Sequence, residues 1–309
     1  MIRFTMPEGA MPQEDRKALL KEQLDGFLRA DALRELLSVI GADQSSLPQM
    51  YGKRRKPSGG VMETQDMQRM PELEKHRDTL YPLFRELGFI DINTPRRRDH
   101  TRLLIYGGAL GTCFDRTRCS ARLLTERTVS VDALTCYRPI NPVERTRSGT
   151  SSMADTEFGA LTEAFRTVYG LDPSAWEDTF IGDRNLNSIA CRRTYGYDTG
   201  NRAYRLFAAP SSQPQLRRAD TGDCLSYYLR QDFPDETDSL LAITSNRYCN
   251  RQFIQTAYQL IHSGCRADFD IIGCLPDNCV STADNYDPLQ YLQDLIGILD
   301  WIERFSCEE

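Results

Sequence analysis

Leu103-Leu104-Ile105-Tyr106-Gly107-Gly108-Ala109-Leu110-Gly111-Thr112-Cys113-Phe114-Asp115-Arg116 reads as a short buried strand, a glycine-rich turn and the opening of a helix. Glycine lets a backbone approach a ligand closely, and the free N–H groups at a helix start favour an anion. Arg116, Arg118 and Arg122 follow on the expected helix and would add bidentate donors. The segment therefore predicts a binding site for an anionic small molecule.

From residue 102 onward, apolar strand-like runs alternate with helical runs. This alternation predicts a three-layer α/β fold, with a mostly parallel sheet covered by helices on both faces. The expected strands are 102–106, 131–137, 204–209, 239–244 and 269–274, and the expected helices are 115–126, 156–169, 219–231, 250–263 and 288–305.

Residues 1–87 have a different pattern, which predicts a helical extension of an α/β domain spanning residues 88–309. Leucines at helical spacing indicate helices over 13–40 and 71–87. The segment 43–70 is polar, basic and rich in Pro and Gly, so we expect an exposed, flexible loop. Within the α/β domain, we expect a mobile loop over the site at 141–155 and an irregular insertion at 172–202.

Composition indicates the cellular compartment of the protein and the classes of partner that it can bind. The 309 residues carry a net charge of −6, with no long apolar run and no apolar core of a signal peptide near the start. We therefore expect a cytoplasmic protein that does not bind membranes. Residues 96–122 hold seven arginines against two aspartates. Such local positive charge indicates an anion site around the glycine turn rather than a general nucleic-acid surface.

Cysteine and acidic residues give no clear metal site. The ten cysteines form no CxxC pair, so reduced structural thiols are expected and a zinc ribbon is not. Asp277, Asp284 and Asp287 lie in a loop after the last expected strand, where oxygen ligands can hold Mg²⁺. Their spacing fits no EF-hand, and a solvated acidic loop is the better interpretation.

Three further loops that follow strands carry polar side chains. Loops after parallel strands gather at the carboxyl edge of the sheet, which is where ligands bind in such folds. Each loop also has a simpler interpretation, because these residue types often cap helices; Asp220 or Thr221 would be an N-cap. The residues concerned are Arg138 after the second strand, Asp220 and Thr221 after the third, and Thr244, Ser245, Arg247 and Arg251 after the fourth.

The order of these motifs resembles the YdcF-like family (DUF218), which includes SanA-like and ElyC-like envelope proteins. The resemblance covers residues 102–275. Its motifs here are LLIYGG with Arg116, Glu157 at the opening of a helix, RADTGD at 218–223, and Thr244-Ser245 with Arg251. The third motif lacks the family's Asn. Tyr248 stands where the family has a His, or that His is absent.

The resemblance implies a Rossmann-like sheet and a nucleotide-type ligand such as S-adenosylmethionine. The pocket that it implies is lined by Gly107, Gly108, Arg116, Thr221, Thr244, Ser245 and Arg251.

We therefore expect the chain to bind an anionic metabolite, nucleotide-like or phosphorylated, with group transfer or hydrolysis as the chemistry if it is an enzyme. The alternative is a ligand sensor or a protein-interaction adaptor. No GxSxG elbow or GxxxxGK[ST] loop is present. The expected roles are backbone phosphate contacts at Gly107, Gly108 and Gly111, charge neutralisation by Arg116, Arg138, Arg247 and Arg251, orientation by Thr244 and Ser245, and general base catalysis by Glu157 or Asp220.

Two further expectations concern single elements. His100 precedes the glycine strand and is the one histidine expected near the site. The C-terminal helix, 288–305, has one apolar face. Packing against the core is the simpler explanation for this face, and an oligomer interface is the second.

Overall fold

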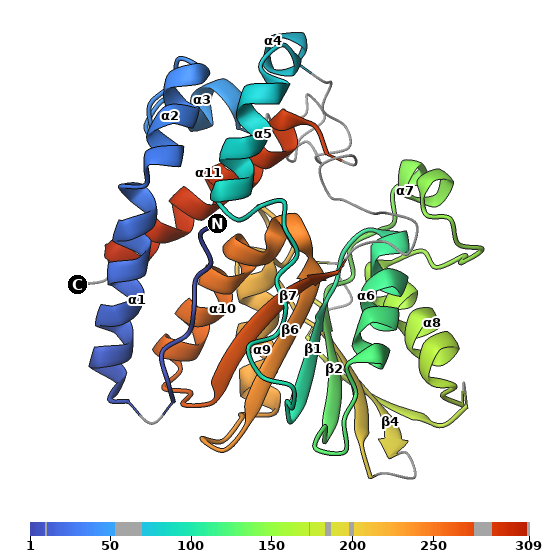
Figure 1. The fold of residues 1–309 in the computed structure, drawn as a ribbon. Helices are drawn as coiled ribbons and strands as arrows, with labels where there is room; N and C mark the ends of the chain where they lie inside the picture. The colour runs from blue at the N-terminus through green and yellow to red at the C-terminus, as the bar shows by residue number, and fades with distance from the viewer. Residues whose placement is uncertain are drawn as a thin grey trace.

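The computed structural model describes residues 1–9, 11–52, 70–172, 174–182, 187–197, 201–274 and 286–307. Within these residues, seven strands form one sheet in the order β3-β4-β5-β2-β1-β6-β7 (Figure 1). β4 runs antiparallel to both of its neighbours, the edge strand β3 and β5, and the pairs that join β5, β2, β1, β6 and β7 are parallel. The bounds are β1 Arg102–Tyr106, β2 Ser130–Thr135, β3 Trp176–Ile181, β4 Ala190–Tyr197, β5 Ala203–Ala208, β6 Ser239–Ser245 and β7 Asp268–Cys274.

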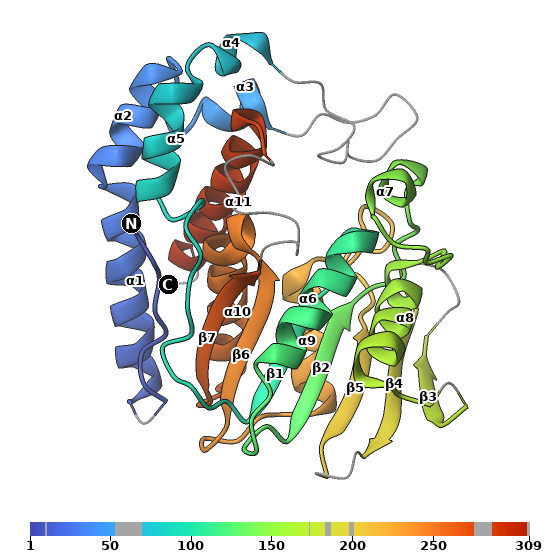
Figure 2. The same cartoon turned by 45° about the vertical axis from the view of Figure 1, so that its right-hand side comes forward.

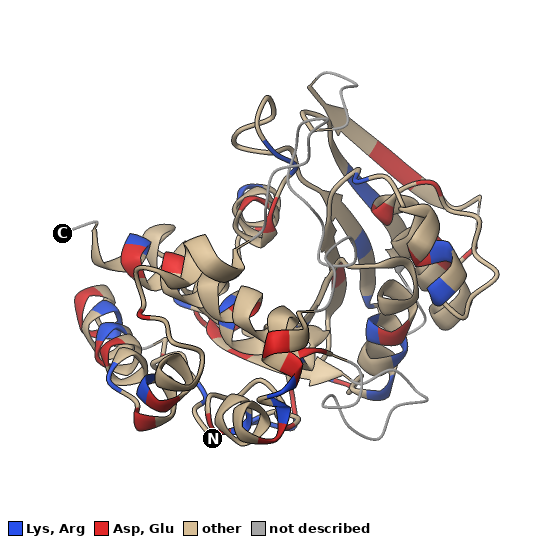
Figure 3. Ribbon diagram, turned by 90° about the horizontal axis from the view of Figure 1, so that it is seen from above, with Lys and Arg blue, Asp and Glu red and all other residues tan. Residues whose placement is uncertain are grey.

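Helices cover both faces of this sheet, which confirms the expected three-layer α/β fold. α6 (Leu110–Arg122) and α8 (Glu157–Tyr169) lie on one face (Figure 2). α9 (Thr221–Gln231), α10 (Cys249–His262) and α11 (Pro288–Ser306) lie on the other. The remaining helices are α1 (Gln13–Leu28), α2 (Asp31–Val39), α3 (Leu47–Tyr51), α4 (Pro71–Glu74), α5 (Arg77–Glu86) and α7 (Pro142–Arg147), with a 3₁₀ turn, η2, at Asn246–Tyr248. Viewed from above, the acidic and basic positions are interspersed along the helices (Figure 3).

The N-terminal helices pack over α10 and α11 and share their hydrophobic core. Leu20, Leu33 and Phe84 belong to the same buried cluster as Phe253 and Leu295. The apolar face of α11 is therefore buried within the chain itself, as the simpler explanation of that helix requires. The division of the chain into a helical extension (1–87) and an α/β domain (88–309) stays a prediction. Among the described residues, no helix combines the length and the apolar character needed to cross a bilayer.

Six expected elements differ from the structure or lie partly outside it. The helix expected over 71–87 is two helices, α4 and α5. The segment 43–70, expected as an exposed loop, contains α3 with Leu47 buried, and its residues 53–69 lie outside the described residues. The helix expected over 13–40 is two helices, because Ala30 takes an extended conformation between them. The helix expected from 115 begins at Leu110, which places Gly111 inside it. The segment 141–155 contains α7. The expected insertion at 172–202 forms the hairpin β3–β4, in which Asp178 pairs with Arg193 directly across the strands at 2.6 and 2.7 Å.

The neighbouring parallel strands β1 and β6 mark a topological switch. The connection through α6 leads from β1 to β2 over one face, and the connection through α10 leads from β6 to β7 over the other. The loops after β1 and β6 therefore part in opposite directions at the carboxyl edge. In open parallel sheets, ligands bind at such a point.

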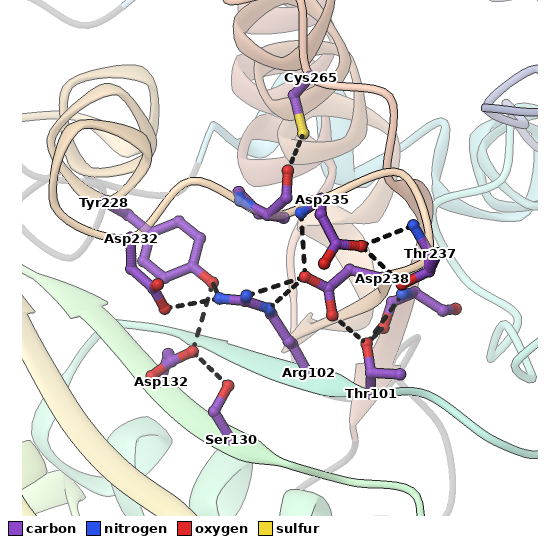
Figure 4. Close-up of polar contacts among 12 residues, drawn as sticks. Thr101, Arg102, Ser130, Asp132, Tyr228, Asp232, Asp235, Thr237, Asp238 and Cys265 are labelled. Atoms are coloured by element: carbon purple, nitrogen blue, oxygen red, sulfur yellow. Dashed lines mark hydrogen bonds and ion pairs between the residues drawn. The ribbon is translucent and has the colours of Figure 1, made fainter. Parts of the chain in front are cut away.

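An ionic network connects the strands in the amino half of the sheet, and Figure 4 shows the part of it around Arg102. Asp132, on β2, is fully buried and accepts hydrogen bonds from Arg205 on β5, its direct neighbour in register, at 2.7 and 3.0 Å. Arg205 also pairs with Asp232 at 2.6 Å. Arg102 on β1 joins Asp232 to Asp238 at 2.6 and 2.8 Å. Three carboxylates and two guanidinium groups thus connect β1, β2, β5 and α9.

Replacing Arg205 with Met should strongly destabilise the protein, because it leaves the fully buried Asp132 without its cation. We expect a loss of about 3–5 kcal/mol, measured from urea unfolding midpoints. Adding Asp132→Leu should recover part of the loss, because the buried charge is then gone as well. Arg34→Ala, which removes an exposed arginine, should change stability by less than about 0.5 kcal/mol. A double variant no more stable than Arg205→Met would contradict this account.

Asp232 should contribute to acid sensitivity. Burial by itself would raise the pKa of Asp232, but Arg205 and Arg102 outweigh burial and lower it below 3.8. A lowered folded-state pKa stabilises the protein above the unfolded value, and that stabilisation is lost as pH falls through the folded value. Asp232→Asn should therefore flatten the loss of thermal stability below about pH 4. An unchanged pH dependence would exclude this role.

Candidate functional site

Arg116 connects the two loops of the switch point. It lies on α6 and is 1% exposed. Its Nη1 donates to the carbonyl oxygens of Tyr106 and Gly107 at 2.6 and 2.5 Å, and its Nη2 donates to Ser245 Oγ at 3.1 Å. No carboxylate among the described residues pairs with it, so its charge is unmatched within that part of the chain.

Arg138 holds the same turn from the side of β2. Its Nη2 donates to the carbonyl oxygen of Gly108 at 2.9 Å. Its Nε and Nη1 pair with Glu157 Oε2 at 2.9 Å and with Glu144 Oε1 at 2.5 Å. Burial alone would lower the pKa of Arg138, but the carboxylates of Glu157 and Glu144 outweigh it and raise the pKa above its usual value. Unlike Arg116, Arg138 is therefore neutralised within the chain.

The glycines of the turn allow this close packing. A Cβ on Gly107 would lie 2.0 Å from Glu157 Oε1, and one on Gly111 would lie 2.7 Å from the carbonyl oxygen of Ser148. The N–H of Gly107 already donates to the carbonyl of Leu134 at 2.8 Å. The expected phosphate-binding role of Gly107, Gly108 and Gly111 stays a prediction, and the structure supplies a packing reason for Gly107 and Gly111.

Two more arginines follow β6 and share one aspartate. Arg247 Nε lies 3.2 Å from Asp294 Oδ2, and Arg251 Nη1 lies 2.9 Å from Asp294 Oδ1. The guanidinium groups of Arg247, Arg251 and Arg116 lie 4.4, 5.0 and 6.0 Å from the centre of the Tyr248 ring. Arg247 Nη1 is buried and has no hydrogen-bond partner in the described part of the chain.

The residues expected after the third strand lie at the start of α9, on the face of the sheet that α9 and α10 cover. Thr244 donates to Gln252, whose amide donates to Thr221 Oγ1 at 3.0 Å. Asp220 is the N-cap of α9 in a capping box with Asp223, so the simpler interpretation of Asp220 is confirmed. A cavity of about 380 Å³ lies beside it, lined in part by Arg217, Tyr258, Gln259, Trp301 and Arg304.

The structure brings Gly107, Gly108, Arg116, Arg138, Glu157 and Ser245 together, with Arg247 and Arg251 around Tyr248. The sequence did not predict Asp294 as a residue of the site. The one available signal was an aspartate within an apolar run, between Leu292 and Leu295.

His100 is not at this site. It lies before the first residue of β1, at the amino edge of the sheet, with its Nδ1 2.9 Å from Ser239 Oγ. The expectation was wrong because a residue that precedes a strand is one strand length away from the carboxyl edge.

The candidate magnesium loop is only partly described. Asp277 and Asp284 lie outside the described residues, and Asp287 is the N-cap of α11. Elsewhere in the described ranges, no group of His, Cys, Asp or Glu has the arrangement of a metal site.

Comparisons with protein-family models, curated proteins and solved structures found no match for this chain.

Gly107→Ala should disrupt the turn, because the new methyl group would displace the Glu157 carboxylate from Thr135 and Arg138. We expect a loss of about 1–3 kcal/mol in the free energy of unfolding, as in other overpacked sites. The matched control is Gly26→Ala on α1, where a Cβ meets nothing within 4 Å. That change should stabilise the protein by about 0.5–1 kcal/mol. Equal effects of the two substitutions would contradict the packing argument.

Proposed function

We propose that this protein binds an anionic metabolite at the switch point between β1 and β6. The observation that carries the proposal is Arg116, which is buried, bridges the two parting loops and is not paired with a carboxylate in the described chain. Burying an unpaired charge is unfavourable, so such a group indicates an anionic partner.

The charges around Tyr248 support the same conclusion. Arg116, Arg247 and Arg251 surround the Tyr248 ring, and among the described residues Asp294 is the one carboxylate that pairs with any of them, Arg247 and Arg251. Three positive charges against one negative charge leave a local excess of two. Guanidinium groups bind phosphate and carboxylate oxygens through paired donors, so a phosphorylated or nucleotide-like ligand fits this excess. S-adenosylmethionine, suggested by the family resemblance, belongs in the same ligand panel.

Binding is supported more directly than catalysis. Glu157 is held by Arg138 and Thr135, and Asp220 caps a helix. A general base must reach its substrate, and both carboxylates are engaged within the chain. Group transfer or hydrolysis at this site therefore stays a prediction.

The proposal is tested by a thermal-shift screen against inorganic phosphate, nucleotides, S-adenosylmethionine, sugar phosphates and dicarboxylates. A ligand at 100 times its dissociation constant stabilises a protein by about 2.7 kcal/mol. Arg251→Ala should remove most of that shift, because Arg251 is the most exposed of the three arginines and its loss should be tolerated. Arg34→Ala, a change of the same charge on α2, should leave the shift intact. If no anion stabilises the wild type, the proposal fails.

A sensor role is the second candidate, and α11 favours it. This helix supplies Asp294, which holds Arg247 and Arg251, and it also packs against α1, α3 and α5. A ligand that binds these arginines in place of Asp294 would free α11 to shift, and the N-terminal helices that pack against α11 would shift with it. Ligand-dependent hydrogen exchange in residues 13–52 and 70–87 would favour a sensor. Unchanged exchange in those residues would exclude it.

A further inference from the structure

The segment between Pro139 and Thr156 is closed at its base and lies over the start of α6. Pro139 and Thr156 form an isolated antiparallel bridge, reinforced by Ile140 N to Asp155 O at 2.9 Å and Glu157 N to Arg138 O at 2.8 Å. The chain between these ends, which we call the 140–155 loop, contains α7. Its residue Ser148 contacts the position where Gly111 has no side chain.

The loop places a carboxylate on the start of α6. Glu144 Oε2 accepts a hydrogen bond from Leu110 N, the first residue of that helix, at 3.2 Å. The same carboxylate takes both terminal nitrogens of Arg138, at 2.5 and 3.1 Å. The Glu144 side chain is 3% exposed. An anion thus already lies at the helix start, bound by a backbone N–H and a guanidinium group.

The surrounding groups are those that would bind the phosphate of a ligand. In a strand–glycine turn–helix unit, the start of the helix after the central strand receives the phosphate. Arg138, the partner of Glu144, donates to the carbonyl oxygen of Gly108, and Arg116 donates to the carbonyl oxygen of Gly107. Glu144 therefore lies at the same glycine turn as the unmatched charge of Arg116. A free oxyanion and Glu144 would require the same donors.

We propose that Glu144 is an internal competitor, and that the 140–155 loop must release it before a phosphate group binds at the start of α6. This inference rests on the proposed function. The ligand class is a phosphate group, whose oxygens would replace the Glu144 carboxylate on Leu110 N and Arg138.

The loop can move without unfolding the domain. Apolar side chains of the loop are exposed, with Met153 at 78% and Val143 at 38%. Its buried apolar residues, Ile140 and Ala154, lie next to the bridge at the base and can stay in place. The bridge and the two backbone hydrogen bonds beside it keep the base of the loop in place while the rest of the loop moves.

The test is titration calorimetry with inorganic phosphate and Glu144→Gln. Gln keeps the size of the side chain but removes its charge, so Arg138 becomes available to phosphate. If the closed loop accounts for about nine in ten molecules, affinity should increase about tenfold. Glu126→Gln, which removes an exposed negative charge, controls for net charge and should bind like the wild type.

Hydrogen exchange of the wild type provides a second measurement that needs no variant. Phosphate should increase exchange in residues 140–155 while the strands keep their protection. The inference is overturned if Glu144→Gln binds phosphate like the wild type and exchange in the loop does not change. In that case phosphate binding lost in Arg251→Ala would still support the proposed function. Absence of phosphate binding in the wild type and in Glu144→Gln would overturn the inference, while the wider ligand panel would still decide the proposed function.

Discussion

Two arginines hold the backbone where the central strand leaves the sheet, and the arrangement of the carboxyl edge depends on them. The carbonyl groups of Tyr106, Gly107 and Gly108 accept hydrogen bonds from Arg116 and Arg138. Buried carbonyls need such donors, since leaving them unpaired is unfavourable. The two arginines come from opposite sides of the turn and fix α6, the chain after β2 and, through Ser245, the end of β6 in one geometry.

The two arginines differ in whether a carboxylate neutralises their charge, so positive charge is unevenly distributed along this edge of the sheet. Arg138 pairs with two glutamates of its own chain, whereas Arg116 has backbone carbonyls and a hydroxyl. Electrostatic interactions are stronger in a buried environment, so the unmatched charge of Arg116 is the main reason for proposing an anionic ligand here. The turn therefore has one arginine that internal carboxylates neutralise and one that no carboxylate of the described residues neutralises.

The sequence predicted the elements that repeat a local pattern and missed those set by distant contacts. The five parallel strands lie within two residues of their expected bounds, because each is a short apolar run. The start of α6 was placed too late, because Leu110 is bound by Glu144 from a loop 34 residues away. The hairpin β3–β4 was missed because its strands are polar and lie at the edge of the sheet. Glycines 107 and 108 and Arg116 were located together, but no local pattern shows that Asp294 of α11 pairs with Arg247 and Arg251.

The contacts of the N-terminal segment determine when its apolar faces become buried during synthesis. Arg3 pairs with Asp270, and Arg16 donates to the carbonyl of Cys265, so the beginning of the chain is held by β7 and the residues before it. A ribosome releases the first helices long before those partners exist. The leucine-rich faces of α1 and α2 therefore stay uncovered until α10, β7 and α11 have been made, and uncovered apolar surfaces are prone to aggregation during that period.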